Sequence, residues 1–233
     1  MVAGGEKFWH SACVERCREA TSFGKVETMP RRYSLILLAA VVVAMLCPAA
    51  AIAQQSPKSF VSSKHQSLMT LLSKGKSAAN DRRIQSEVDG MLDYDLLANE
   101  AMASIRGKLS DSQQTEFRTL LKKLVRKAYR KDLDKTVNYA VEILGATKLS
   151  GHKYRVVSGE PQLVDTIAKH KQNKREDPVR IGYVLRKQGS GWIVFDILTE
   201  GSSLVLNYRS QFKRVVDKHG PAELLKRMRR KAN

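Results

Sequence analysis

Residues 191–212 read GWIVFDILTEGSSLVLNYRSQF and contain the change of pattern that decides the fold. The first part is an apolar run interrupted only by Asp196, which is typical of a buried strand. Residues 201–203, Gly-Ser-Ser, then provide helix-capping side chains, and the apolar residues after them recur at helical spacing. The stretch predicts a strand, a tight turn and a helix in direct succession.

The sequence on either side extends this pattern. Residues 179–185 alternate between apolar and polar, and a glycine-rich segment at 188–191 joins them to the strand above, which predicts an antiparallel hairpin. Alternating apolar residues predict further strands around Val141 and Ile143, Tyr154 and Val156, and Leu163 and Ile167. On the other side, the closing helix should end at Gly220, and Pro221 should begin a last short helix.

The first half of the chain shows helical spacing instead. Short helices are predicted around 68–72 and between Asp81 and Gly107, and Ser110 with Gln113 forms a capping box. The long helix that follows has one apolar face, formed by Phe117, Leu120, Leu121, Leu124, Val125, Ala128, Tyr129 and Leu133. We therefore predict an α+β fold, with N-terminal helices packed on an antiparallel, curved sheet and C-terminal helices enclosing an apolar pocket.

Residues 29–53 have the three parts of a secretory signal peptide: two arginines, an apolar run and an Ala-Ile-Ala site. We expect export out of the cytoplasm with cleavage after Ala53. Residues 1–28 are then an extension from a start codon assigned too early, 54–64 a flexible linker and 65–233 a single domain. An uncleaved anchor, a twin-arginine route and a lipoprotein signal at Cys47 are the alternatives.

The composition indicates the compartment and the kind of partner. The chain has 41 Lys and Arg against 23 Asp and Glu, of which 6 and 4 precede residue 54, so residues 54–233 carry a net charge of +16. This charge favours a polyanion, either nucleic acid or an anionic lipid surface. All three cysteines also precede residue 54, so the domain tolerates an oxidising compartment.

Motifs for catalysis or metal binding are absent from the sequence of the domain. Its histidines are scattered, and it contains neither a nucleophile elbow nor a phosphate loop. Asp196 and Glu200 are the only carboxylates that suggest an acid and base pair. A strand-end aspartate more often bonds the backbone of the following turn, so we favour a structural role.

The segment 191–212 as a whole resembles the Mla-type (maintenance of lipid asymmetry) periplasmic phospholipid shuttle, the MlaC-like or toluene-tolerance family. The likeness extends more weakly from about Tyr94 to Leu225. The charged run at 169–177 departs from the family pattern, because a shorter connection is expected there, and it leaves the strand boundaries open.

The resemblance implies a monomeric lipid carrier rather than an enzyme. Its apolar pocket, between sheet and helices, would hold phospholipid acyl chains as cargo, without a metal or other cofactor. Its partners would be an outer-membrane lipoprotein complex and an inner-membrane ABC transporter with a lipid-binding subunit, and not nucleic acid.

Two sets of residues follow from these expectations. The residues expected to line the lipid pocket sit on apolar faces that must meet: Leu120, Leu124, Tyr183, Leu185, Val194, Phe195, Leu204, Val205, Tyr208 and Phe212. The residues expected to fix the turn before the closing helix are Asp196, Glu200, Asn207 and Arg209. Two alternatives stay open: a small-molecule enzyme using Asp196 and Glu200, and an exported basic protein that binds nucleic acid or anionic surfaces.

Overall fold

The computed structural model describes residues 55–233, without the side chains of Lys131, Asp132 and Asp134. The predicted N-terminal extension and the signal peptide with its cleavage site lie outside the described residues.

Side-chain caps define the starts of the helices in the first half. Ser56, Ser77, Asp93 and Ser110 each accept a hydrogen bond from a backbone N–H in the first turn of a helix. These helices are α2 (Pro57–Leu72), α3 (Ala78–Met91), α4 (Tyr94–Met102) and α5 (Asp111–Thr136), with a short 3-10 turn, η2 (Arg106–Lys108), before α5. The capping box of Ser110 and Gln113 forms as predicted.

The linker predicted over 54–64 is wrong from Pro57 onward, because α2 already begins there. Ser56 provides the cap and Pro57 stands in the first turn, where its missing N–H costs nothing. Phe60 and Val61 of this helix are buried in the domain. The polar composition of the segment reflects its outer face, while these two apolar residues attach it to the domain.

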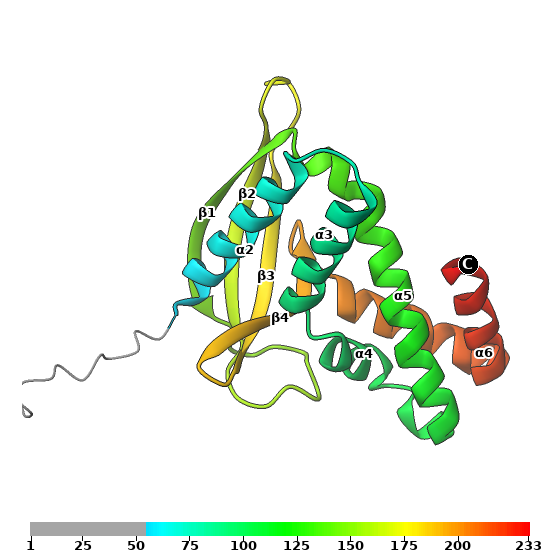
Figure 1. The fold of residues 1–233 in the computed structure, drawn as a ribbon. Helices are drawn as coiled ribbons and strands as arrows, with labels where there is room; N and C mark the ends of the chain where they lie inside the picture. Colours follow the sequence, from blue (N-terminus) through cyan, green and yellow to red (C-terminus); the bar gives the residue numbers. More distant parts are fainter. Residues whose placement is uncertain (1–54) are drawn as a thin grey trace, which may run out of the picture. The chain divides into compact units, whose positions relative to one another are not determined.

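The second half contains the antiparallel sheet. Its strands are β1 (Tyr139–Lys148), β2 (Gln162–His170), β3 (Val179–Gln188), β4 (Gly191–Thr199) and the short β5 (Ser202–Ser203), and they pair in sequence order. The predicted hairpin is β3 and β4, and Gly189 takes a positive φ of 58° in its turn. Helices on one side of an antiparallel sheet confirm the α+β prediction (Figure 1).

Tyr154 and Val156 do not form a strand, contrary to the prediction from their alternation. They lie in the loop 149–161 between β1 and β2. The charged run near 170–177 is the connection between β2 and β3, so these strands reach His170 and resume at Val179.

The closing helix α6 (Leu204–Ala232) changes direction at Gly220. There φ is +78° and ψ is 169°, a conformation that is essentially restricted to glycine. Pro221 then begins the last segment, which turns back toward α5, as Figure 1 shows. The predicted stop and restart of the helix are confirmed.

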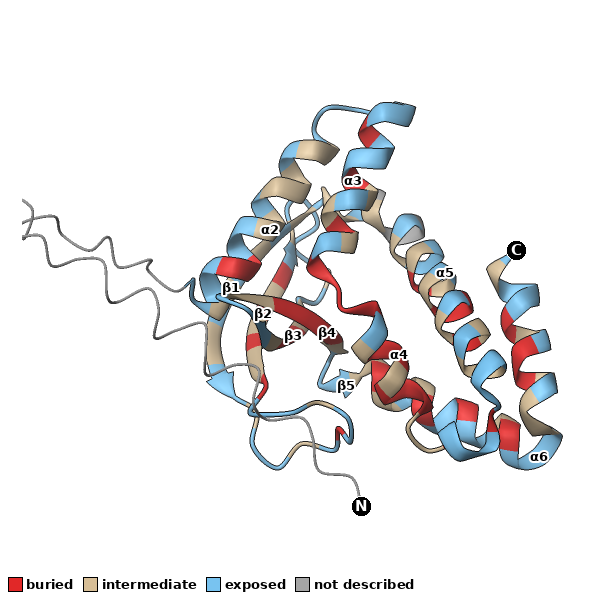
Figure 2. Cartoon of the chain, turned by 60° about the horizontal axis from the view of Figure 1, so that its bottom comes forward, coloured by how far each residue is buried: buried red, intermediate tan, exposed pale blue. Residues whose placement is uncertain are grey.

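Two apolar clusters hold the domain together. The main one joins the inner face of the sheet to the helices and includes Phe117, Leu121, Leu185 and Val194. A smaller cluster on the other face of the sheet contains Tyr154, Val184 and Phe195. Figure 2 shows buried residues on the sides of α4, α5 and α6 that face one another. Within residues 55–233, no helix is both long enough and apolar enough to cross a membrane.

Candidate functional site

Asp196 organises the turn between β4 and α6. Its carboxylate accepts hydrogen bonds from the N–H groups of Ile197 and Val205, at 2.8 and 3.0 Å, and from the hydroxyls of Tyr154 (2.6 Å) and Ser203. Burial raises the pKa of Asp196, and the four donors oppose this effect. Donors thus surround both oxygens of Asp196 and join β4 to the start of α6.

Glu200 lies in the same turn but does not join Asp196. Its φ is +48°, and its carboxylate accepts the N–H of Arg180 at 2.6 Å, while its own N–H donates to the carbonyl of Arg180 at 3.0 Å. The two carboxylates that suggested an acid and base pair are thus held by separate structural bonds. Asn207 is exposed on the first turn of α6.

Arg209 does not hold this turn, and it instead joins α6 to α4. It forms an ion pair of 2.5 Å with Glu100, a fully buried carboxylate, and donates to the carbonyls of Glu100 and Lys153 at 2.8 and 2.9 Å. Burial lowers the pKa of Arg209, an effect that Glu100 opposes. The predicted role of Arg209 is therefore corrected to the fastening of two helices and the loop 149–161.

Glu100 is the residue that the sequence analysis missed in this cluster. Its carboxylate also accepts the backbone N–H groups of Arg155, Val156 and Val157, at 2.7 to 2.8 Å. These bonds explain why the segment around Val156 is a loop, since its donors bind Glu100 instead of a neighbouring strand. A glutamate in the helical stretch 94–102 gives no sign of a partner 109 residues away.

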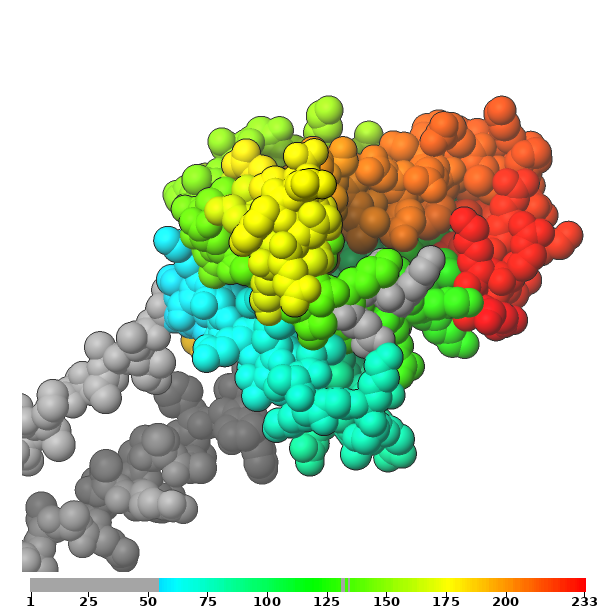
Figure 3. All heavy atoms as spheres, turned by 90° about the horizontal axis from the view of Figure 1, so that it is seen from above, coloured from blue at the N-terminus to red at the C-terminus, as the bar shows by residue number. Residues whose placement is uncertain are grey.

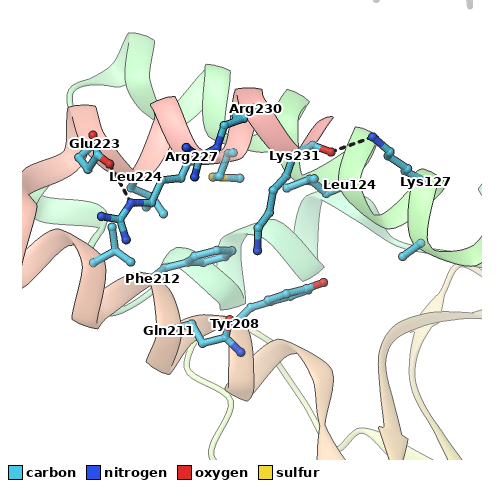
Figure 4. A pocket seen from close by; sticks show the side chains of 13 residues that line it. Leu124, Lys127, Tyr208, Gln211, Phe212, Glu223, Leu224, Arg227, Arg230 and Lys231 are labelled. Carbon is cyan, nitrogen blue, oxygen red and sulfur yellow. Dashed lines mark hydrogen bonds and ion pairs between the residues drawn. The ribbon is translucent and has the colours of Figure 1, made fainter. Parts of the chain in front are cut away.

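A hollow lies between α5 and the two segments of α6. It has a volume of about 720 Å³ and is open to solvent. We call it the groove. Its apolar lining comprises Leu124, Ala128, Tyr208, Phe212, Val215, Leu224 and Met228, and its polar lining Lys127, Gln211, Glu223, Arg227, Arg230 and Lys231 (Figure 4). Seen from above, the surface is hollowed between the green α5 and the orange and red parts of α6 (Figure 3).

Aromatic rings fix the floor of the groove. Phe212 packs edge-on against Phe117 of α5, with ring centroids 5.2 Å apart, and stacks on Tyr208 at 5.4 Å with nearly parallel rings. Burial raises the pKa of the Tyr208 hydroxyl. The floor therefore consists largely of packed aromatic rings.

A second, smaller hollow of about 270 Å³ lies between α2 and the sheet. Val61, Ser62 and His65 of α2 line one side, and Val141, Ile143 and Tyr183 of the sheet line the other. Desolvation lowers the pKa of His65, and the nearby Lys171 adds to this effect.

The residues predicted to line a lipid pocket are divided among these regions. Leu124, Tyr208 and Phe212 line the groove, and Tyr183 lines the smaller hollow. Leu120, Leu185, Val194 and Val205 are buried in the main core, and Leu204 is half-buried at the start of α6. Phe195 faces the opposite side of the sheet from Val194, because consecutive residues of a strand point to opposite faces.

The groove also contains residues that the sequence analysis did not select. Leu224 and Met228 have the i, i+4 spacing that could have indicated an apolar face in the last segment. Arg227, Arg230 and Lys231 belong to the basic tail, whose charge was visible but whose position beside α5 depends on the turn at Gly220. Within residues 55–233, no cluster of His, Cys, Asp or Glu has the arrangement of a metal site.

One comparison with known proteins identifies a family, and another identifies a similar fold. The family described as "MlaC protein" matches residues 63–230. Among solved structures, the fold is similar to a phospholipid-binding protein from Ralstonia solanacearum in complex with a phospholipid, with a TM-score of 0.59 and 19% identity over 77% of this chain and 96% of that one. No curated protein matches the sequence. Because the family match extends over well more than half of the chain, this protein belongs to the MlaC family.

Proposed function

We propose that this protein is a periplasmic phospholipid carrier, which moves lipid between an outer-membrane lipoprotein complex and an inner-membrane ABC transporter. The observation that carries the proposal is the groove, with its apolar floor and a volume of about 720 Å³. Small-molecule pockets span about 300–1,000 Å³, so the groove is large enough for much of the apolar part of a lipid. The similar Ralstonia protein was solved with a phospholipid, which supports this choice of cargo.

The physical need for a carrier follows from the cost of exposing acyl chains to water. Each CH₂ contributes about 0.8 kcal/mol, so releasing both chains of a phospholipid would cost on the order of 20 kcal/mol. Transfer from a bilayer to an apolar groove exchanges one apolar environment for another, and its net free energy is small enough to reverse. This role requires no catalytic group.

The periplasmic location is part of the proposal and rests on the sequence. The predicted signal at 29–53 and the absence of cysteine from residues 54–233 both suit an exported protein. The mass of the protein recovered from the periplasm tests this directly. A chain that begins at Gln54 is expected, whereas an uncleaved chain in the cytoplasm would refute the location.

Native mass spectrometry of protein purified without added lipid, followed by extraction, tests the cargo. Wild type should carry phospholipid. Ala128→Trp, which places an indole in the groove from an exposed position on α5, should lose most of it. Ala222→Trp makes the same change at an exposed alanine of α6 outside the groove lining, and it should keep the lipid. A lipid-free wild type, or equal lipid in both variants, would contradict the proposal.

The alternative of a basic protein that binds anionic surfaces makes a different prediction. Such binding depends on charge and collapses as salt rises. Lipid held by its acyl chains in the groove should stay bound in high salt, so retention through a high-salt wash separates the two hypotheses.

A further inference from the structure

The lining of the groove combines an apolar floor with an excess of positive charge. Lys127 of α5 and Arg227, Arg230 and Lys231 of α6 contribute four cations, while Glu223 contributes the only carboxylate of the described lining. Glu223 accepts a hydrogen bond from Arg227 at 2.8 Å, so its charge is already compensated. The lining therefore carries a net positive charge beside an apolar surface.

Two of these cations have no carboxylate partner in the part of the chain whose side chains are described. Among the described residues, no carboxylate lies within ion-pair distance of the side chains of Arg230 and Lys231, although the neighbouring Arg229 binds Glu116 of α5. Both side chains are exposed. Figure 4 shows the ammonium of Lys231 extending toward Phe212 and Tyr208. This charge thus lies beside the apolar floor while it stays accessible to solvent.

The fold holds the cations in this position. Gly220 reverses the direction of α6, and Leu224, Leu225 and Met228 are buried against the rest of the domain. Lys127 donates to the backbone carbonyl of Lys231 at 3.1 Å, a bond that satisfies a free carbonyl at the end of the helix. The basic segment is therefore attached to α5 at Lys231 and, through the ion pair with Glu116, at Arg229.

We infer that these cations form a phosphate site that makes the groove selective for phospholipids with a net negative head group. The inference rests on the proposed function, because it assumes that acyl chains occupy the groove. In a glycerophospholipid the phosphate lies directly next to the acyl region. Acyl chains on the apolar floor of the groove would therefore bring the phosphate close to Arg230 and Lys231. The extra cation of a zwitterionic head group would meet like charges here, whereas an anionic head group would not.

Competition between two lipids with identical acyl chains tests the site. The purified protein is equilibrated with excess neutral detergent micelles that contain equimolar phosphatidylglycerol and phosphatidylcholine, and the bound lipids are extracted and counted by mass spectrometry. At low salt we expect phosphatidylglycerol to be preferred about fivefold or more, the factor that one Lys or Arg contributes beside an anionic lipid. Because the composition is read at equilibrium, differences in the rate of encounter do not affect it.

A pair of matched variants locates the effect. The double variant Arg230→Gln with Lys231→Gln should reduce the preference to less than about twofold while total bound lipid stays unchanged. The double variant Arg214→Gln with Lys218→Gln removes the same charge from exposed positions of α6 outside the groove, and it should keep the wild-type preference. Equal loss in both variants would show an effect of overall charge and overturn the inference.

The remaining outcomes separate the site from the carrier function. Wild type that binds both lipids equally would overturn the phosphate site and leave the carrier intact, and protein that binds neither lipid would overturn both. Inorganic phosphate and chloride at matched ionic strength should weaken the preference equally, because the site takes the phosphate of a lipid held in the groove. Loss of preference with phosphate alone would identify a site for free phosphate and contradict the inference.

Discussion

Two regions of α6 contain concentrated charge, and they differ in how that charge is compensated. Near its start, Arg209 pairs with the buried Glu100 in a cluster where carboxylate and guanidinium both have several partners. Near its end, Arg230 and Lys231 lie along an open groove with no carboxylate partner among the described residues. Compensated charge in the interior fastens elements together, while uncompensated charge beside an apolar hollow is available to a ligand.

The largest effect on stability should come from the buried cluster. Arg209→Met leaves Glu100 as an uncompensated charge in the core, and it should lower the free energy of unfolding by about 3–5 kcal/mol. Urea denaturation measures the loss. Lys213→Met is the control on the same helix, because Lys213 pairs with Asp217 at the surface, and it should unfold like wild type. An Arg209→Met protein as stable as wild type would show that the cluster does not fasten the fold.

The next largest effect should come from the turn that joins the two regions. Gly220→Ala introduces a Cβ at a φ of +78°, where no other atom lies within 4 Å, so its cost of about 2 kcal/mol comes from the backbone alone. The variant should also bind less lipid, because the last segment forms one wall of the groove. Gly107→Ala is the control, since Gly107 has open space around it without a positive φ. Equal stability of the two variants would remove Gly220 as the determinant of this turn.

A smaller effect, with a characteristic pH dependence, should come from Asp196→Asn. An amide in place of the carboxylate cannot accept all four hydrogen bonds, so the free energy of unfolding should fall by about 1 kcal/mol. Burial raises the folded-state pKa of Asp196, so the stabilisation from this group is complete below its unfolded value and is lost as pH rises through the folded pKa. Asparagine does not titrate, so the stability gap to wild type should be wider at low pH than at neutral pH. A gap that widens toward neutral pH would mean that the four donors outweigh burial.

The smallest effect on stability should come from the groove itself. Arg230→Gln with Lys231→Gln removes charges that pair with no carboxylate of the described side chains, so the denaturation midpoint should not move measurably, even though lipid selectivity changes. The same midpoint is expected for Arg214→Gln with Lys218→Gln. A large destabilisation of the first variant alone would assign its two residues to the fold.

Local sequence signals predicted much of the fold. Ser110 with Gln113 gave the start of α5, the glycines at 188–191 gave the hairpin, and Gly220 with Pro221 gave the break in α6. Each of these depends on a few neighbouring residues whose backbone preferences are strong. The family resemblance of 191–212, which the match over 63–230 confirms, rested on such a local segment.

Features that depend on distant residues were not predictable in this way. Alternating apolar residues such as Tyr154 and Val156 occur in loops as well as in strands. Here the hydrogen bonds from the backbone to Glu100 hold the segment as a loop. Phe195 is a different case, because strand alternation alone places it on the face opposite Val194, and the sequence could have separated these two residues. The basic tail read as an exposed helix end, because its position against α5 depends on tertiary packing.

Photo-crosslinking with a phospholipid that has a photoreactive group on one acyl chain tests the central claim most directly. The account predicts crosslinked peptides from α5 and α6 that contain groove residues such as Leu124, Phe212 and Leu224. Crosslinks confined to Val61 and Tyr183 would instead place the acyl chain in the smaller hollow between α2 and the sheet, and would contradict the assignment of the groove as the lipid site.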